Sequence, residues 1–277
     1  MATDTTSEGN RDSQPQSEVA YQEMLSLLRN LSALRAELIK KAVLCLRLEP
    51  ATVHAKLGRG QPLLSGEPLV FPSQFLRTAL IDLRSKLPPA GKSRLALDQL
   101  LAGNGIAEVP LAEIVADREA YIARVSSCAT QAPELAALVL DVLIASFIQK
   151  QIEPYRAWID AAGWRHGRCP VCGSHPYMAR LSGDNGRRSL ACSLCYTEWT
   201  FDRLRCPFCD NTDQDQLRYF TVEGDTAHRV DCCDRCRRYL KTVDERVSSG
   251  STDLLLEDMA TAHLDAVALQ QGYQWGC

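Results

Sequence analysis

The sequence of 277 residues predicts an α-helical domain, then a small β domain stabilised by metal ions, and finally one more helix. Three observations predict this class. Apolar residues recur at helical spacing over the first half of the chain, eight cysteines then occur as four CxxC pairs, and the last stretch returns to helical spacing. With 45% hydrophobic residues, the chain can form a packed core and two domains.

The four CxxC pairs form two sets of four cysteines, the ligand number of a tetrahedral metal site. Two thiolates separated by two residues fit on one tight turn, and two such turns can bind one ion. The central spacers have 19 residues in the first set and 23 in the second, so the pattern predicts two tandem rubredoxin-like or zinc-ribbon modules. The predicted metal ligands are Cys169, Cys172, Cys192 and Cys195 for one ion, and Cys206, Cys209, Cys233 and Cys236 for the other.

Several alternatives within this pattern stay open. Cys232 adjoins Cys233 and offers a CxxxC spacing with Cys236, but we favour Cys233 because it keeps the two-residue spacing of the other pairs. Sequential use of the pairs is the simpler arrangement, and a cross-braced arrangement is an alternative. Four thiolates accept zinc or iron. Cys45 and Cys128 lie in helical patterns and are predicted to be small buried apolar residues.

The N-terminal part divides into a polar tail, residues 1–18, predicted to be disordered, and a helical domain, residues 19–163. Apolar residues at three- and four-residue steps from Val19 to Leu48 predict one long helix or two abutting helices that end before Pro50. Residues 58–72 are rich in turn formers, include Gln61-Pro62-Leu63-Leu64, and are predicted to cross the surface of the helical domain.

Further helices follow in the same domain, and one of them is apolar nearly all round. Leu135 to Ile148 predicts a helix at the centre of the bundle, and at about 14 residues with Asp141 inside it is too short and too charged to span a bilayer. The other predicted helices are Phe75–Leu87, Leu95–Leu101 and Pro110–Val125.

The region 164–247 is the predicted double metal-binding domain. Alternation over Tyr196–Phe201 predicts a strand, and residues 183–186 predict a hairpin turn. Residues 248–277 contain a predicted helix, Asp253–Gln271, that packs back on the helical domain. Its predicted apolar side consists of Leu255, Met259, His263, Leu264 and Val267.

No catalytic constellation accompanies these features. The five histidines are scattered, and the sequence has no phosphate-binding glycine loop and no GxSxG element, so we predict no enzyme activity and no small-molecule substrate. The N-terminal stretch has no apolar run, which predicts a cytoplasmic protein without membrane insertion. Residues 165–241 hold 13 Arg and Lys against 10 Asp and Glu, and each divalent ion on four thiolates would add a net charge of −2, which argues against nucleic-acid binding.

The cysteine motifs closely resemble the formate dehydrogenase accessory protein FdhE family. The resemblance covers most of the chain, is most specific between about Trp164 and Lys241, and extends more weakly to Gln61-Pro62-Leu63-Leu64 and to Asp258 through Tyr273. The motifs are Cys169-Pro-Val-Cys-Gly, Arg188-Ser-Leu-Ala-Cys-Ser-Leu-Cys-Tyr-Thr-Glu-Trp, Arg203-Leu-Arg-Cys-Pro-Phe-Cys and Cys233-Asp-Arg-Cys-Arg-Arg-Tyr-Leu-Lys241.

The resemblance implies a cytoplasmic assembly factor that matures respiratory formate dehydrogenase and binds its catalytic subunit before export. It also implies a helical domain, a double rubredoxin-like domain and iron at the eight cysteines. Two other classes of function stay as alternatives: a rubredoxin-like electron carrier and a zinc-ribbon protein that binds nucleic acid.

Overall fold

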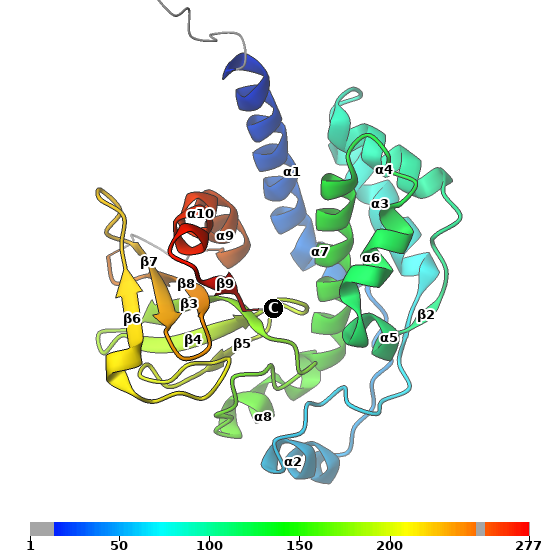
Figure 1. Ribbon diagram of the computed structural model, residues 1–277. Helices are drawn as coiled ribbons and strands as arrows, with labels where there is room; N and C mark the ends of the chain where they lie inside the picture. Colours follow the sequence, from blue (N-terminus) through cyan, green and yellow to red (C-terminus); the bar gives the residue numbers. More distant parts are fainter. Residues whose placement is uncertain (1–13, 248–252, 277) are drawn as a thin grey trace, which may run out of the picture.

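The computed structural model describes residues 14–247 and 253–276, in which a helical part lies beside one β-sheet and two C-terminal helices cover part of that sheet (Figure 1). A short ladder between β1 (Val70–Phe71) and β2 (Val109–Pro110) ties together two loops of the helical part. The helices of this part are α1 (Gln14–Lys41), α2 (Pro50–Gly58), α3 (Ser73–Lys86), α4 (Lys92–Ala102), α5 (Leu111–Ala116), α6 (Arg118–Ser126), α7 (Pro133–Ile152) and α8 (Arg156–Ala161), with a 3₁₀ turn at Glu153–Tyr155.

Helix α7 lies at the centre of the helical part, as its apolar residues predict. It contacts α1, α4 and α6, and the Phe147 ring packs edge-on against Phe71 with ring centroids 5.3 Å apart. By length and composition alone, the segment Pro133–Ala161 could span a membrane. However, 72% of its most apolar window is buried inside the protein, which fits the core helix of a soluble protein.

The first helix ends earlier than predicted. Helix α1 stops at Lys41, and the next residues are irregular because the Gln151 side chain binds their backbone. The Gln151 Oε1 accepts a hydrogen bond from the Cys45 N–H (2.8 Å), and its Nε2 donates to the Val43 carbonyl (2.8 Å). The helix thus ends before Pro50, as predicted, and Pro50 itself occupies the first turn of α2, a helix that was not predicted.

Two further predicted helices are each divided in two by a capping residue. The predicted helix Pro110–Val125 is α5 and α6, because Asp117 caps α6 by accepting a hydrogen bond from the Ala120 N–H (2.9 Å). The predicted helix Asp253–Gln271 is α9 (Leu254–Ala260) and α10 (Ala262–Gln270), with Thr261 between them. The Thr261 hydroxyl donates to the Glu257 carbonyl (2.7 Å), a local bond that competes with helix continuation.

The C-terminal part contains one sheet rather than two separate modules. Its strands run in the order β5-β4-β3-β8-β7-β6, and β9 also pairs with β8. Parallel pairing of β3 with β8 joins the two cysteine modules, whereas neighbours within each module are antiparallel. The strands are β3 (Pro176–Ser182), β4 (Arg187–Cys192), β5 (Glu198–Thr200), β6 (Leu217–Phe220), β7 (His228–Cys233), β8 (Arg238–Asp244) and β9 (Gln274–Trp275), with a 3₁₀ turn at Gln214–Gln216 before β6.

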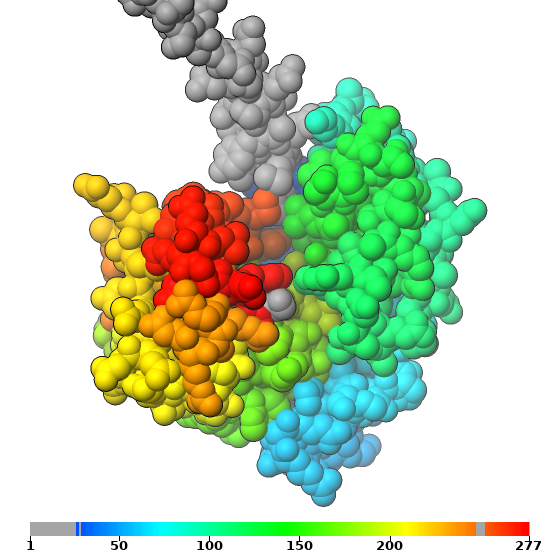
Figure 2. All heavy atoms as spheres, in the orientation of Figure 1, coloured from blue at the N-terminus to red at the C-terminus, as the bar shows by residue number. Residues whose placement is uncertain are grey.

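The two C-terminal helices pack on one face of this sheet (Figures 1 and 2). Leu264 and Ala268 of α10 pack against Val230 and Tyr239 of the sheet. In α9, Leu255 belongs to the main core that extends into the helical part. The final helical segment therefore contacts both parts of the molecule, and His263, predicted on its apolar side, is exposed.

The main hydrophobic core is continuous from the helical part into the sheet. It contains α1 and α7 residues together with Leu190, Trp199 and Leu240 of the sheet and all four cysteines of the first set. The proposed domain bounds, 19–163, 164–247 and 248–277, therefore stay a prediction. The predicted disordered tail, 1–18, lies outside the described residues except for its last five, which belong to α1.

Candidate metal centre

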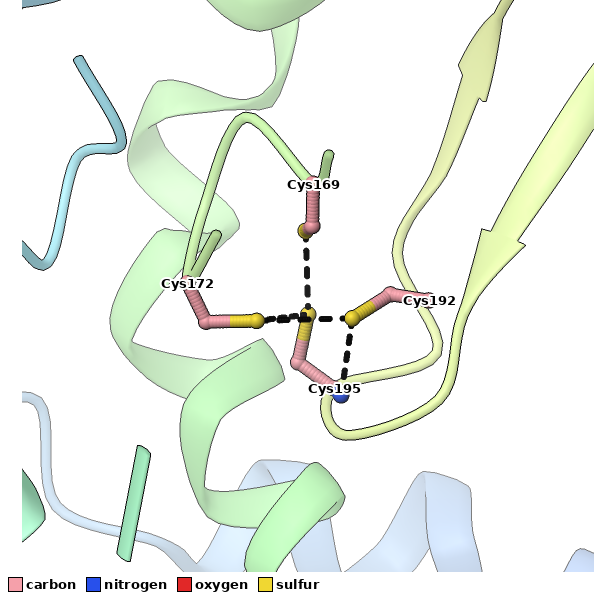
Figure 3. Close-up of side chains that lie close together, drawn as sticks. All are labelled: Cys169, Cys172, Cys192 and Cys195. Carbon is pink, nitrogen blue, oxygen red and sulfur yellow. Dashed lines mark hydrogen bonds between the residues drawn. The ribbon is translucent and has the colours of Figure 1, made fainter. Parts of the chain in front are cut away.

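The eight predicted ligands form two separate groups of four, in which all sulfur atoms lie within 4.8 Å of one another. Figure 3 shows the first set, with the four sulfurs converging from two loops. In that set the Sγ atoms of Cys169 and Cys195 are 3.5 Å apart, and those of Cys172 and Cys192 are 3.4 Å apart. In the second set, the Sγ atoms of Cys206 and Cys236 are 3.7 Å apart, as are those of Cys209 and Cys233.

These distances fit a tetrahedral ion. Metal–thiolate bonds of about 2.3 Å give a tetrahedron with edges of about 3.8 Å, whereas a disulfide would bring two sulfurs to about 2 Å. The structure groups the pairs sequentially, not in a cross-braced arrangement. Cys169, Cys172, Cys192 and Cys195 would hold one ion, and the other four cysteines would hold the second.

Cys233, rather than Cys232, lies in the second set. The two residues are neighbours on β7, and consecutive strand residues point to opposite faces of a sheet. The Cys232 side chain packs with Tyr239, Leu264 and Tyr273 on the face that α10 covers. The favoured choice of Cys233 therefore agrees with the geometry.

All four CxxC pairs use the same backbone turn. The residue after the second cysteine donates its N–H to the carbonyl of the first cysteine, with distances of 2.8 to 3.1 Å. That residue has a positive φ in every turn: Gly173 at 84°, Tyr196 at 54°, Asp210 at 58° and Arg237 at 58°. Within residues 14–247 and 253–276, Tyr196, Asp210 and Arg237 are the only non-glycine residues with positive φ. The turn therefore requires a backbone conformation that is strained for any residue except glycine. Only the first pair is followed by a glycine.

Backbone N–H groups inside these turns point at the sulfur atoms. Cys169 Sγ accepts from the Val171 N–H, Cys192 Sγ from the Leu194 N–H and Cys206 Sγ from the Phe208 N–H, each at 3.4 Å. In the second set, the Asn211 side chain also donates to Cys233 Sγ (3.6 Å). Such donors stabilise negative charge on sulfur, as a metal-bound thiolate needs.

Burial makes ionisation of several of these thiols unfavourable without a compensating charge. It raises the pKa of Cys169 and of Cys192 well above the usual value. For Cys172, hydrogen bonds from Cys169, Cys192 and Cys195 outweigh burial and lower its pKa well below that value. In the second set, burial raises the pKa of Cys236 to about 11. A cation bound among the sulfurs supplies the charge that lets all four ionise together, so the donor set fits a metal ion.

The helical part holds both turns of the first set. The N–H groups of Leu63 and Leu64 donate to the carbonyls of Pro170 and Val171, each at 2.9 Å, which accounts for the Gln61-Pro62-Leu63-Leu64 motif. The second turn is held by side chains. Arg118 Nη1 donates to the Ser193 carbonyl (2.9 Å), and Gln149 Nε2 donates to the Cys195 carbonyl (3.1 Å).

The roles of Arg118 and Gln149 were not predicted from the sequence. Each lies on a helix whose pattern indicates only packing, and their carbonyl partners are more than 40 residues away, so no local signal could have identified them. The two sets also differ in burial: all four cysteines of the first are buried, whereas Cys209 and Cys236 of the second are partly exposed.

Other predicted residues are placed differently from expectation. Cys45 is exposed and Cys128 is half-buried, so neither is a fully buried apolar residue.

His228 has two acidic partners, which sequence spacing did not reveal. Its Nδ1 lies 2.9 Å from an Asp225 oxygen and its Nε2 lies 2.7 Å from a Glu257 oxygen, linking β7 to α9.

Fold and site together define a protein of helices and one larger sheet, with two four-cysteine clusters that could each hold a metal ion. Residues 168–203 match the family model described as FdhE, central domain, and residues 204–276 match FdhE, C-terminal domain. Each matched domain contains one set of four cysteines. Residues 168–276, which carry both sets of cysteines, are thus similar to the two FdhE domains, and the resemblance of the cysteine motifs to the FdhE family is confirmed.

Curated relatives match a part of the chain. An FdhE homolog of Aquifex aeolicus (strain VF5) is 35% identical over 113 residues, 40% of this chain and 40% of that protein. An FdhE homolog of Edwardsiella ictaluri (strain 93-146) is 37% identical over 123 residues, 43% of this chain and 39% of that protein. These alignments therefore span well under half the length of either relative.

The fold is similar to a solved structure over nearly the whole chain. The crystal structure of the FdhE protein from Pseudomonas aeruginosa superimposes with a TM-score of 0.58 at 22% sequence identity. The superposition covers 91% of this chain and 84% of that one. The helical part, which the family models do not match, thus has an FdhE-like fold.

Proposed function

We propose that the protein is a cytoplasmic accessory factor for the maturation of respiratory formate dehydrogenase and that it binds the catalytic subunit of that enzyme. The match of residues 168–276 to the FdhE family models supports this proposal, because the family resemblance implies that role. The two sets of four cysteines, each bringing its sulfurs within 4.8 Å, are the structural observation that carries it.

The metal sites support a binding role rather than catalysis. Four thiolates complete a tetrahedral shell and leave no position for a water molecule, so such a site does not hydrolyse a substrate. The ions would hold the CxxC turns together, and through Leu63, Leu64, Arg118 and Gln149 they would fix the sheet against the helices. The resemblance favours iron, and zinc has the same coordination preference.

A rubredoxin-like electron carrier is the alternative that one observation favours. Cys209 and Cys236 are partly exposed, so an iron ion in the second set would lie near the surface, within reach of a redox partner. The first set is buried and has no such access. If electrons are carried, the second set is the one to carry them.

The experiment that tests the proposal compares one ligand variant from each set in cells that lack the wild-type protein. Cys172→Ser and Cys209→Ser each remove a soft ligand, and Cys128→Ser, outside both sets, is the matched control. We expect the wild type and the control to co-purify with the formate dehydrogenase catalytic subunit and to support formate oxidation. Full formate oxidation in cells lacking the protein would contradict the accessory role.

The same variants separate the two functions. If the ions only hold the fold, association and enzyme maturation should fail together in Cys172→Ser. If the second set carries electrons, Cys209→Ser should still associate with the catalytic subunit while formate oxidation fails.

A further inference from the structure

A cavity of about 160 Å³ lies beside the second cysteine set. It opens on the face of the sheet opposite α10, because Arg229 and Asp231 alternate along β7 with Val230 and Cys232, which pack toward α10. Its walls come from β6, β7, β8, the start of β4 and the segment 203–208 that leads into the third CxxC pair. No residue of this cavity other than Cys206 and Cys233 belongs to the cysteine sets.

Arginine dominates the wall of this cavity. Six arginines line it, and Asp231 is the one carboxylate among its lining residues. In the part of the chain that the structure describes, Arg203 and Arg238 have no carboxylate within ion-pair distance. The six are Arg188, Arg203, Arg205, Arg218, Arg229 and Arg238.

Arg188 is the least exposed of the six, at 3% of its surface. Its Nη1 donates to the Arg205 carbonyl (3.3 Å), and its Nη2 lies 3.4 Å from Asp231. Its Nε–H has no hydrogen-bond partner among the described residues, which is costly for a buried charged group. Asp231 also pairs with Arg229 at 2.9 Å and accepts from the Thr242 hydroxyl, so its charge is shared.

The cysteine sulfurs do not satisfy these arginines. In the second set they accept hydrogen bonds from the Phe208 N–H and the Asn211 side chain. Within the described residues, no arginine of the cavity donates to a cysteine sulfur. Among the described residues, the cavity thus keeps guanidinium groups that have no carboxylate partner.

Apolar and aromatic side chains complete the wall. The Arg238 guanidinium lies 5.8 Å from the Phe208 ring centroid, and that of Arg229 lies 5.1 Å from the Tyr219 ring centroid. Tyr219 and Leu204 are 65% and 58% exposed, so they offer an uncovered apolar surface at the mouth. A ligand for this cavity would combine an anionic group with a flat or apolar body.

We propose that this cavity is a binding site for a phosphate group, free or carried by a small organic ligand such as a nucleotide. The phosphate oxygens would accept hydrogen bonds from Arg203 and Arg238, and the buried Arg188 guanidinium would add positive charge beside them, since guanidinium and phosphate form strong charge-assisted pairs. An attached base would pack against Phe208 or Tyr219. Neither the metal sites nor the proposed accessory role requires this site.

Calorimetric titration of the metal-loaded, full-length protein tests the proposal with inorganic phosphate, AMP and adenosine as probes. We expect phosphate and AMP to bind in competition and adenosine not to bind. In the double variant Arg203→Gln/Arg238→Gln, affinity should fall at least tenfold. Arg59→Gln, an exposed arginine of the helical part, is the matched control and should bind as the wild type does. Metal content is measured in each variant, so that a loss of binding is not a loss of fold.

The relative affinities identify the source of the phosphate. Tighter binding of AMP than of phosphate supports a nucleotide-like ligand, and equal affinities support free phosphate. The proposal is overturned if neither probe binds at millimolar concentration, or if Arg59→Gln weakens binding as much as the double variant. Binding of a single-stranded oligonucleotide far more tightly than AMP would also overturn it, in favour of a nucleic-acid surface.

Discussion

At the scale of single residues, the position after each CxxC pair shows how the backbone limits the sequence. Tyr196, Asp210 and Arg237 adopt positive φ, a conformation that non-glycine residues rarely adopt. Asp210 is well exposed, and its carboxylate pairs with Arg205 at 2.8 Å. It therefore offers a position where backbone strain can be varied with little change in packing.

We predict opposite effects for two substitutions at this position. Asp210→Gly should retain or increase metal affinity at the second set, because glycine adopts positive φ freely. Asp210→Val should destabilise that site by roughly 1–2 kcal/mol, because a β-branched residue is strained there. Chelator titration of purified protein measures the difference. Asp202→Val, which removes the other acidic partner of Arg205, is the control and should resemble the wild type.

Asp141 is a second residue whose environment leads to a testable prediction, which concerns how stability depends on pH. It lies on α7, 3.6 Å from Arg118, and burial raises its pKa to about 6 despite that arginine. A carboxyl group with a raised pKa stabilises the fold while protonated, and this stability is lost as the pH rises through about 6. At neutral pH the charged form therefore destabilises the protein.

We expect Asp141→Asn to be more stable than the wild type above this pH. The advantage should be near zero at about pH 4, grow through about pH 6 and reach up to about 3 kcal/mol near pH 8. Denaturant unfolding at a series of pH values measures it. An advantage that stays constant with pH would show that Asp141 does not titrate in this range.

At the scale of elements, helices α6 and α7 hold the second CxxC turn of the first set. Arg118 and Gln149 each donate to one carbonyl of that turn. We predict that Gln149→Ala, which leaves the buried Cys195 carbonyl without this donor, destabilises the first site by about 1–3 kcal/mol. The ion of the first set should then be lost to a chelator earlier, while the second ion is retained. Gln74→Ala, an exposed residue of α3, serves as the control, and equal loss of both ions would contradict this assignment.

The elements also show which features sequence could predict. The CxxC turns were predictable because two residues separate the ligands of each pair and the hydrogen bonds of each turn are local. The central position of α7 was predictable from its apolar residues. Helix breaks at Asp117 and Thr261 were not, since they depend on hydrogen bonds between a side chain and the backbone that compete with a continuous apolar pattern. The binding of Gln151 to residues 43–46 is likewise a long-range contact with no local signal.

At the scale of the whole molecule, parallel pairing of β3 with β8 turns two predicted modules into one sheet. Met178 pairs with Lys241 in that ladder, so the contact joins residues far apart in the chain. Sequence periodicity predicts a strand but not its partner, which is why this pairing was not anticipated. The same limit applies to the arginine cavity, because its six arginines are dispersed from Arg188 to Arg238.

The continuous core predicts that the helical part depends on the sheet. A cut at Gly163 would expose residues of the helical part that share one hydrophobic core with Leu190 and Trp199. We therefore expect residues 14–163 alone to remain helical in circular dichroism but to melt at a lower temperature than the whole metal-loaded chain. An unchanged melting temperature would show that the two parts are independent.

The most direct test of two four-cysteine metal sites is the metal content of anaerobically purified protein, determined by elemental analysis for the wild type and for two ligand variants. We predict two ions per chain in the wild type and one in each of Cys172→Ser and Cys209→Ser. A visible charge-transfer band would identify iron, and a colourless loaded protein would identify zinc. One ion or none in the wild type would contradict the assignment.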